Sequence, residues 1–397
     1  MAETKVVCIC GGGNGAHVLA GLAAAQAQAE VRVLTLLKNE ASKWSASLRD
    51  SELVVIRRDD SSEIMAKPAF VTDKASRAVT GADVIIFCVP AFAHRMYLEA
   101  IVPHLERHVA IVGLPGRPGF EFQCLEVMRD APCSVLSYES LPWSCRILEY
   151  GRKVEILGTK DTLTGTAVSK KAQLRFDPVA FLQSVLGELP ALVTAGKFLD
   201  VSLMSKSFIH PALMYAKWKD WDGQPLSEMP LFYQGVSESD VAFLSAVSDE
   251  IVTTAREVGK LRPDLGSGDV DHIFPWIVRS YKYSVQDLTS LYTALKTNSA
   301  YDGLLHPMTK TVDGKWIPDF THRYLSEDVP CGLVVVKGLA ELAGVASPAI
   351  DRLLAWCQVK LGKEFLVGSE LKGDDVKVTR APQAFGYKAL DEVSASL

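Results

Sequence analysis

The chain has 397 residues, 48% hydrophobic and 22% charged, and its 42 Lys and Arg against 47 Asp and Glu give a formal net charge of −5. This composition excludes a mainly disordered chain, and the lack of a basic excess argues against a nucleic-acid-binding protein. No apolar run approaches the ~18 residues of a membrane span. The length predicts two domains.

The cysteines and asparagines indicate a protein of a reducing compartment. The eight cysteines show no C-x-x-C spacing, so neither a zinc ribbon nor a disulfide framework is expected. No asparagine lies in a glycosylation sequon, and the first apolar run, residues 6–10, is too short for a signal peptide. We therefore predict a cytoplasmic protein with no metal site and no membrane or nucleic-acid partner.

Strand-like and helix-like segments alternate over the first part of the chain. Short apolar runs rich in β-branched residues predict strands, and alanine-rich stretches such as residues 16–29 predict the helices between them. The predicted strands are residues 6–10, 31–36, 83–89, 109–114 and 134–137, with 154–158 as a possible addition. Buried strands separated by helices are typical of a doubly wound parallel sheet. We predict an α/β Rossmann-type domain over residues 1–200.

The second part of the chain loses this alternation. Residues 181–203 predict a long helix that Pro190 interrupts. Further helices are predicted over residues 236–261, 270–295 and 329–361, and the more polar residues 372–397 are expected to run over the surface. We predict an all-helical domain over residues 201–397.

A glycine-rich turn follows the first predicted strand. Residues 11–16 contain G-x-G-x-x-A at Gly11, Gly13 and Ala16, directly before the first predicted helix. Gly11 allows a tight turn, Gly13 lets a pyrophosphate approach the backbone, and Ala16 lets the helix pack closely on the sheet. The free N–H groups of the helix N-terminus then favour phosphate. This context predicts a dinucleotide site.

The residues at the end of the second predicted strand do not decide whether the cofactor is NAD or NADP. An NAD site usually has Asp or Glu there to accept a hydrogen bond from the ribose 2′-hydroxyl, but this chain reads Thr35-Leu36-Leu37-Lys38. Thr35 offers a hydrogen-bond acceptor, whereas Lys38 suits a 2′-phosphate.

Several motifs recur in order along nearly the whole chain. They are CGGGNGAH (10–17), VPAFAH (89–94), GLP (113–115), GFEFQC (119–124), LPW (141–143), SFIHPA (207–212), PLFYQG (230–235) and RYLSEDVP (323–330). In this combination the chain resembles the opine dehydrogenases of marine invertebrates, the octopine dehydrogenase group. The resemblance implies an N-terminal nucleotide-binding domain, a C-terminal helical domain, an active site in the cleft between them, NADH as cofactor, and a monomer.

The family's reaction is a reductive condensation. The amino group of an amino acid meets an α-keto acid, usually pyruvate, and the imine takes a hydride from NADH to give an opine. The resemblance places the proton-transferring group at His210, its orienting carboxylate at Asp328, and the cation for the pyruvate carboxylate at Arg323. Without the resemblance, Arg323 and Asp328 would be interpreted as a surface ion pair. Because proline disfavours helical backbone in the residue before it, we expect His210 at a helix end.

The remaining predicted site residues contact the cofactor or the substrates. Those for the cofactor are Gly11, Gly13, Asn14, Gly15, Ala16, Thr35 and Pro90. Those for the substrates are Arg117, Glu139, Cys145, Lys206 and Trp276. The octopine-type pattern has uncharged residues where this chain has Arg117 and Lys206, and added cations would repel a guanidinium. We therefore expect taurine, alanine, glycine or β-alanine as the amine, with taurine slightly favoured.

Three alternatives stay open. The chain could use L-arginine as an octopine dehydrogenase does, or it could be a 2-hydroxy-acid dehydrogenase that needs no amine. A nucleotide-binding sensor without turnover belongs to a different class, and the joint presence of His210, Arg323 and Asp328 argues against it.

Overall fold

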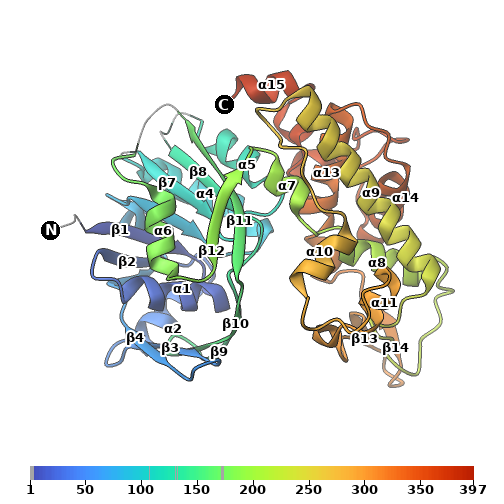
Figure 1. Ribbon diagram of the computed structural model, residues 1–397. Coiled ribbons are helices and arrows are strands. Elements are labelled where there is room, and N and C mark those ends of the chain that lie inside the picture. Colours follow the sequence, from blue (N-terminus) through green and yellow to red (C-terminus); the bar gives the residue numbers. More distant parts are fainter. Residues whose placement is uncertain (1–3, 107, 130, 132, 171–173) are drawn as a thin grey trace. The chain divides into compact units, whose positions relative to one another are not determined.

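The computed structural model describes residues 4–106, 108–129, 131, 133–170 and 174–397. The chain forms two compact units, an N-terminal unit of Met1–Val201 with Leu397 and a C-terminal unit of Ser202–Ser396 (Figure 1). The assignment of cofactor binding to residues 1–200 and substrate binding to residues 201–397 stays a prediction.

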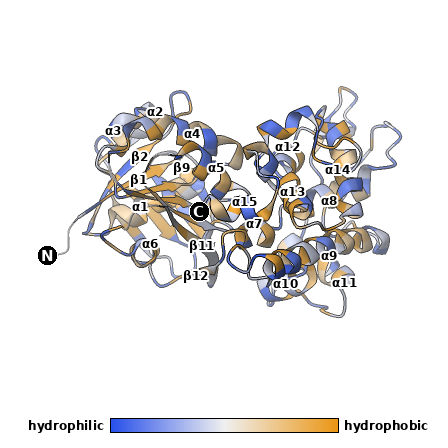
Figure 2. Cartoon of the chain, turned by 90° about the horizontal axis from the view of Figure 1, so that it is seen from above, coloured by the Kyte–Doolittle hydropathy of each residue, from blue (hydrophilic) through white to orange (hydrophobic). Residues whose placement is uncertain are grey.

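The N-terminal unit is built on an eight-stranded sheet of order β12-β11-β8-β7-β6-β1-β2-β5. Its strands are β1 (Lys5–Cys10), β2 (Ala29–Leu34), β5 (Phe70–Thr72), β6 (Val84–Phe87), β7 (Val109–Gly113), β8 (Cys133–Tyr138), β11 (Thr162–Lys170) and β12 (Ala191–Gly196). Within this sheet, the neighbouring strands β8-β7-β6-β1-β2-β5 are all parallel, and their order is that of a doubly wound sheet. Strand β11 runs antiparallel to β8. Their apolar colouring is visible along β1 and β2 in Figure 2. The predicted α/β fold is confirmed.

Helices pack on the large sheet, and a smaller sheet packs on the first of these helices. The helices are α1 (Asn14–Ala24), α2 (Glu40–Ser47), α3 (Ala75–Val79), α4 (His94–Ile101), α5 (Phe120–Val127) and α6 (Pro178–Leu186), with short 3₁₀ turns at Ala91–Ala93 and Val102–His104. The second sheet has the order β4-β3-β10-β9, from β3 (Leu53–Arg57), β4 (Glu63–Ala66), β9 (Trp143–Glu149) and β10 (Lys153–Thr159). It packs on α1 so closely that a Cβ on Gly21 would collide with Val55. The additional strand predicted at residues 154–158 therefore exists, but in this second sheet.

The long helix predicted over residues 181–203 is wrong. Helix α6 ends at Gly187, whose φ of 88° a residue with a side chain rarely adopts. The chain then forms β12, which pairs in parallel with β11, and a short helix α7 (Asp200–Met204). Pairing with β11 determines that residues 191–196 form a strand, so the local composition of these residues does not reveal it.

The C-terminal unit is helical apart from one two-stranded hairpin, β13 (Met308–Lys310) and β14 (Trp316–Pro318). Its helices are α8 (Ile209–Trp218), α9 (Glu238–Leu261), α10 (Ile273–Ser280), α11 (Leu291–Lys296), α12 (Arg323–Ser326), α13 (Val334–Leu342), α14 (Pro348–Leu361) and α15 (Leu390–Ala395). Shorter turns are Ser299–Tyr301, Asp374–Val378 and Pro382–Phe385, with a π-helical turn at Val329–Leu333. The helix predicted over residues 236–261 is α9, which opens with a capping box of Ser237 and Asp240.

Two other predicted helices are each divided. Residues 270–295 form α10 and α11, because a second capping box at Ser290 begins a new helix. Residues 329–361 form the π-helical turn, α13 and α14, separated at Gly344, whose φ is 68°. Local start and stop signals were present in the sequence at both breaks.

The polar C-terminal segment does not run over the surface as predicted. Val376 and Ala381 belong to the core of the C-terminal unit together with Phe365, Leu366 and Leu371. Arg380 is only 2% exposed and Val393 is fully buried. The apolar side chains of this segment therefore complete the hydrophobic core that the preceding helices form.

A buried lysine connects three helices of the C-terminal unit. Lys337 of α13 lies 2.6 Å from Asp351 of α14 and 3.7 Å from Glu341, and it donates a hydrogen bond of 3.1 Å to Ser347. Glu250 of α9 accepts hydrogen bonds from the first backbone N–H groups of α14, and burial raises the pKa values of Glu250 and Glu341. One buried cation thus interacts with three partly buried carboxylates.

Within the part of the chain that the structure describes, no helix combines the length and the apolar character that crossing a bilayer demands.

Candidate active site

The glycine turn connects β1 to α1 and leaves one side open. Gly11 has a φ of +126°, and a Cβ there would lie 2.6 Å from the carbonyl oxygen of Cys88. Gly13 is exposed, and a Cβ on it would meet nothing within 4 Å. Asn14 begins α1, and its side-chain oxygen accepts a hydrogen bond of 2.9 Å from the backbone N–H of Ile147. Gly15 and Ala16 are buried in the first turn of α1. The turn therefore has the shape that a pyrophosphate requires.

The buried side chain of His17 fixes the backbone of the glycine turn. Its Nε2 accepts a hydrogen bond of 3.0 Å from the N–H of Gly151, so the ring proton lies on Nδ1 and is donated to the carbonyl of Gly13 at 3.0 Å. The ring stacks on Trp44 at 3.7 Å, and burial lowers its pKa to about 4. A neutral His17 thus directs the Gly13 carbonyl into the protein. The predicted site residues did not include it, although it closes the motif at residues 10–17.

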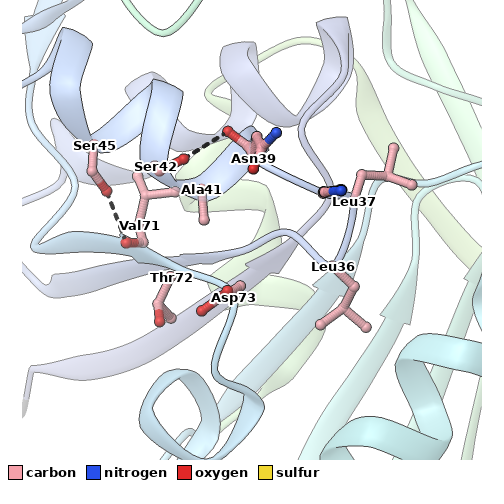
Figure 3. Close-up of a pocket in the computed structure, with 10 residues that line it drawn as sticks. Leu36, Leu37, Asn39, Ala41, Ser42, Ser45, Val71, Thr72 and Asp73 are labelled. Carbon is pink, nitrogen blue, oxygen red and sulfur yellow. Dashed lines mark hydrogen bonds between the residues drawn. The ribbon is translucent and has the colours of Figure 1, made fainter.

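The end of β2 differs from the usual NAD pattern. Thr35 is fully buried, and its hydroxyl donates a hydrogen bond to Glu40 in the first turn of α2. Beyond Thr35 a cavity of about 370 Å³ opens between α2 and the ends of β2 and β5 (Figure 3). Pro90, the other predicted cofactor residue of this region, is exposed directly after β6.

His210 lies at the centre of an aromatic and acidic cluster in the C-terminal unit. Its Nδ1 lies 2.6 Å from Asp328, which is 5% exposed, and its Nε2 lies 3.0 Å from the hydroxyl of Tyr233. Tyr324 stacks on the imidazole at 3.9 Å. Because an ionised carboxylate only accepts, Nδ1 carries a proton and donates it to Asp328. Nε2 is then the nitrogen that exchanges a proton with its surroundings.

The backbone at His210 is helical, contrary to the expectation of an extended residue before proline. His210 and Pro211 occupy the first turn of α8, where the N–H that proline lacks has no partner within the helix. His210 therefore lies at the beginning of a helix, and the bias against helical backbone before proline is overridden.

The hydroxyl facing His210 is neutral. Burial raises the pKa of Tyr233 far above its ordinary value, and Tyr324, Tyr281 and Asp328 raise it further. The phenol therefore donates to a neutral imidazole at Nε2 and accepts from a protonated one. Tyr233 and Tyr324 were not among the predicted site residues, although both lie in motifs that carried the resemblance.

Arg323 and Asp328 do not form the surface ion pair that they would suggest on their own. Arg323, the first residue of α12, lies 2.8 Å from the buried carboxylate of Glu327, and its side chain is 56% exposed. Asp328 faces His210 instead. The guanidinium is thus held at one side and accessible to solvent at another.

The five predicted substrate residues divide between the two units. In the C-terminal unit, Lys206 donates a hydrogen bond of 3.0 Å to the carbonyl of Asp271 and lies 5.9 Å from the ring of Trp276. In the N-terminal unit, Arg117 has a φ of 66° in the turn after β7, and Glu139 follows β8. Both act on the pKa of Lys160. Desolvation lowers this pKa, Glu139 raises it and Arg117 lowers it.

Cys145 is a buried residue of the edge strand β9. It is 3% exposed, and burial raises the pKa of its thiol to about 11. A thiol that stays protonated at neutral pH is no nucleophile, which agrees with a packing role.

Comparison with known proteins shows a relationship along the whole chain. A family model described as NAD/NADP octopine/nopaline dehydrogenase, alpha-helical domain, matches residues 194–361. An opine dehydrogenase of Haliotis discus hannai is 48% identical over 98% of each chain. Tauropine dehydrogenase of Arabella iricolor is 43% identical over 98% of this chain and 99% of its own. The chain belongs to the opine dehydrogenase family.

Solved structures of this family support the same fold. A structure of octopine dehydrogenase with NADH and L-arginine is 45% identical, covers 98% of each chain and superposes with a TM-score of 0.93. The family model is described as NAD/NADP-dependent and the similar solved structure holds NADH, so the predicted family, enzyme class and nicotinamide cofactor are confirmed. The roles of the individual site residues stay predictions.

The opine dehydrogenase fold offers a turn that fits this cofactor. The open side of Gly13 and the first backbone N–H groups of α1 would hold the pyrophosphate. The Gly13 carbonyl, which would repel phosphate, is occupied by His17.

Proposed function

We propose that this protein condenses pyruvate with a small or anionic-tailed amino acid and reduces the product with NADH. The observation that carries the proposal is the set of His210, Asp328, Tyr233 and Arg323 in a chain of this family. Bound NADH supplies the hydride that reduces the imine. His210 moves the proton at Nε2, and Asp328 fixes the tautomer that makes this possible.

Arg323 is proposed to bind the pyruvate carboxylate. Its contact with Glu327 fixes one side of a guanidinium that is 56% exposed, so the rest of the planar group can make a forked contact with a carboxylate. Lysine cannot reproduce this geometry.

Replacing Arg323 by lysine tests this role. Arg323→Lys is expected to raise the KM for pyruvate about tenfold to hundredfold, because a charge-assisted, two-pronged contact is lost. Initial rates of NADH oxidation at varied pyruvate measure it, with Arg352→Lys on the exposed face of α14 as the control. Unchanged pyruvate dependence in Arg323→Lys would remove Arg323 from the site.

The charges around Trp276 favour an anionic-tailed amine. Lys206 lies 5.9 Å from the Trp276 ring, and Arg279 of the same helix forms an ion pair with Asp271. Two cations against one carboxylate would repel a guanidinium and attract a sulfonate or carboxylate. Identity alone does not decide the amine, since an octopine dehydrogenase of Mizuhopecten yessoensis is 45% identical to this chain. Taurine is the preferred candidate.

The function is tested by NADH oxidation with pyruvate, alone and with taurine, alanine, glycine, β-alanine or L-arginine. Oxidation that requires an amine supports opine synthesis, and oxidation with pyruvate alone would indicate a 2-hydroxy-acid dehydrogenase. A finding that L-arginine is the best amine would contradict the proposed substrate class.

Lys206 provides a sharper test of the amine. Lys206→Met is expected to raise the KM for taurine about tenfold, the loss of one charge-assisted hydrogen bond, while the KM for pyruvate stays unchanged. Lys282→Met, at an exposed position beyond α10, is the matched control. An unchanged KM for taurine in Lys206→Met would show that Lys206 does not bind the sulfonate.

A further inference from the structure

An acidic side chain reaches the place where the end of β2 lacks one. Glu40 lies in the first turn of α2, and its carboxylate accepts the hydrogen bond of the Thr35 hydroxyl. The same oxygen lies so close to Gly12, the second residue of the glycine turn, that a Cβ there would collide with it. Glu40 thus places its charge between the glycine turn and the residue after β2. A dinucleotide fold brings the adenine ribose to this place.

The surroundings of Glu40 keep the carboxylate oriented. Thr35 is fully buried, so its hydroxyl is a fixed donor. The Tyr150 hydroxyl would also contact a Cβ on Gly12, at 3.0 Å, and Lys43 lines the same cavity as Glu40 and Tyr150. The position of Glu40 at the N-terminus of α2 favours its negative charge.

The cavity beyond the end of β2 is a poor phosphate site (Figure 3). Lys38 is its cation, but the carboxylate of Asp73 lines the same cavity. The hydroxyl of Ser42 donates to the carbonyl of Asn39, and that of Ser45 donates to the carbonyl of Val71, both at 3.0 Å. The two serine hydroxyls of this cavity are therefore used within the protein, and its one lysine faces a carboxylate in the same lining.

We infer that Glu40 makes the site selective for NADH over NADPH. Its carboxylate accepts from the hydroxyls of the adenine ribose and repels a 2′-phosphate, the role that an acidic residue at the end of the second strand has in other dinucleotide folds. The inference rests on the proposed function only in that the glycine turn binds a dinucleotide. On this inference Glu40 decides between the two cofactors, which Thr35 and Lys38 left open.

Equilibrium binding tests this inference without turnover. Dissociation constants for NADH and for NADPH are measured by titrating the intrinsic fluorescence of the full chain, with neither pyruvate nor amine present. Glu40→Gln keeps the size of the side chain and the acceptor for Thr35 but removes the charge. It is expected to weaken NADH about tenfold and to lower the preference for NADH over NADPH by at least that factor. Glu63→Gln, on β4 of the second sheet and 50% exposed, is the matched control.

A second variant separates the effect of the carboxylate charge from the effect of the side-chain length. Glu40→Asp keeps the charge and shortens the side chain, so it is expected to weaken NADH while NADPH stays excluded. An unchanged NADH-to-NADPH ratio in Glu40→Gln would overturn the inference even when the parent chain binds NADH. Failure of the parent chain to bind either dinucleotide would overturn the proposed function, and the inference with it.

Discussion

Asp328→Asn is expected to lower kcat about 10³-fold while leaving the affinity for NADH unchanged. Asp328 accepts the Nδ1 proton of His210 at 2.6 Å and thereby leaves Nε2 free to exchange a proton. An asparagine can present its amide N–H to Nδ1, which forces the ring proton onto Nε2 and yields the wrong tautomer. The corresponding carboxylate-to-amide change in a serine protease triad has an effect of about 10⁴-fold.

Steady-state rates with pyruvate and the best amine measure this effect, and NADH titration shows that the cofactor site is intact. Asp220→Asn is the matched control, because Asp220 is 82% exposed and pairs only with its neighbour Lys219 among the contacts described. A kcat within a few-fold of the parent would show that Asp328 does not set the state of His210.

Lys337→Met is expected to lower the free energy of unfolding by about 3–5 kcal/mol, the usual result of removing one partner of a buried ion pair. Lys337 is 4% exposed and faces Asp351, Glu341 and Glu250. Methionine fills a similar volume but leaves three carboxylates without their cation. Urea unfolding of the full chain measures the change.

The defect of Lys337→Met is expected to be smaller at pH 5 than at pH 7. Burial raises the pKa values of Glu250 and Glu341 in the folded protein. Groups of this kind contribute stability at low pH and lose it as the pH rises through the folded pKa, because the folded state then holds an unfavourable charge. Lys260→Met on α9, at a lysine that is 74% exposed, should change the stability by less than about 0.5 kcal/mol. A pH-independent defect would contradict the electrostatic explanation.

The sequence predicted those parts of the fold that local pattern determines. The apolar run before the glycine turn is β1, and the periodic segment that begins at the Ser237 capping box is α9. Strand β12 was predicted as helix because its pairing with β11 decides its structure. The burial of the C-terminal segment was also missed, since its few apolar residues fill gaps that only the folded helices create.

Candidate site residues were predictable where they lie in a motif shared with the family and have a role there, as His210, Asp328 and Arg323 do. Residues that act from a distance were missed. Tyr233 reaches His210 across 23 positions of the chain, and His17 meets Gly151 across 134. Glu40 does not follow from the usual sequence pattern, which places the acidic residue at the end of β2, whereas the structure supplies one from the next helix.

The packing of the C-terminal segment also determines where this protein can be cut. The family model ends at residue 361, but Phe365, Leu366 and Val376 complete the core of the C-terminal unit. Each such side chain contributes about 1.5–3 kcal/mol when buried, so a recombinant fragment that stops at residue 361 would expose a large apolar surface and be prone to aggregation. The end of the family-model match and the end of the folded core therefore lie at different residues, and limited proteolysis should spare the segment that follows α14.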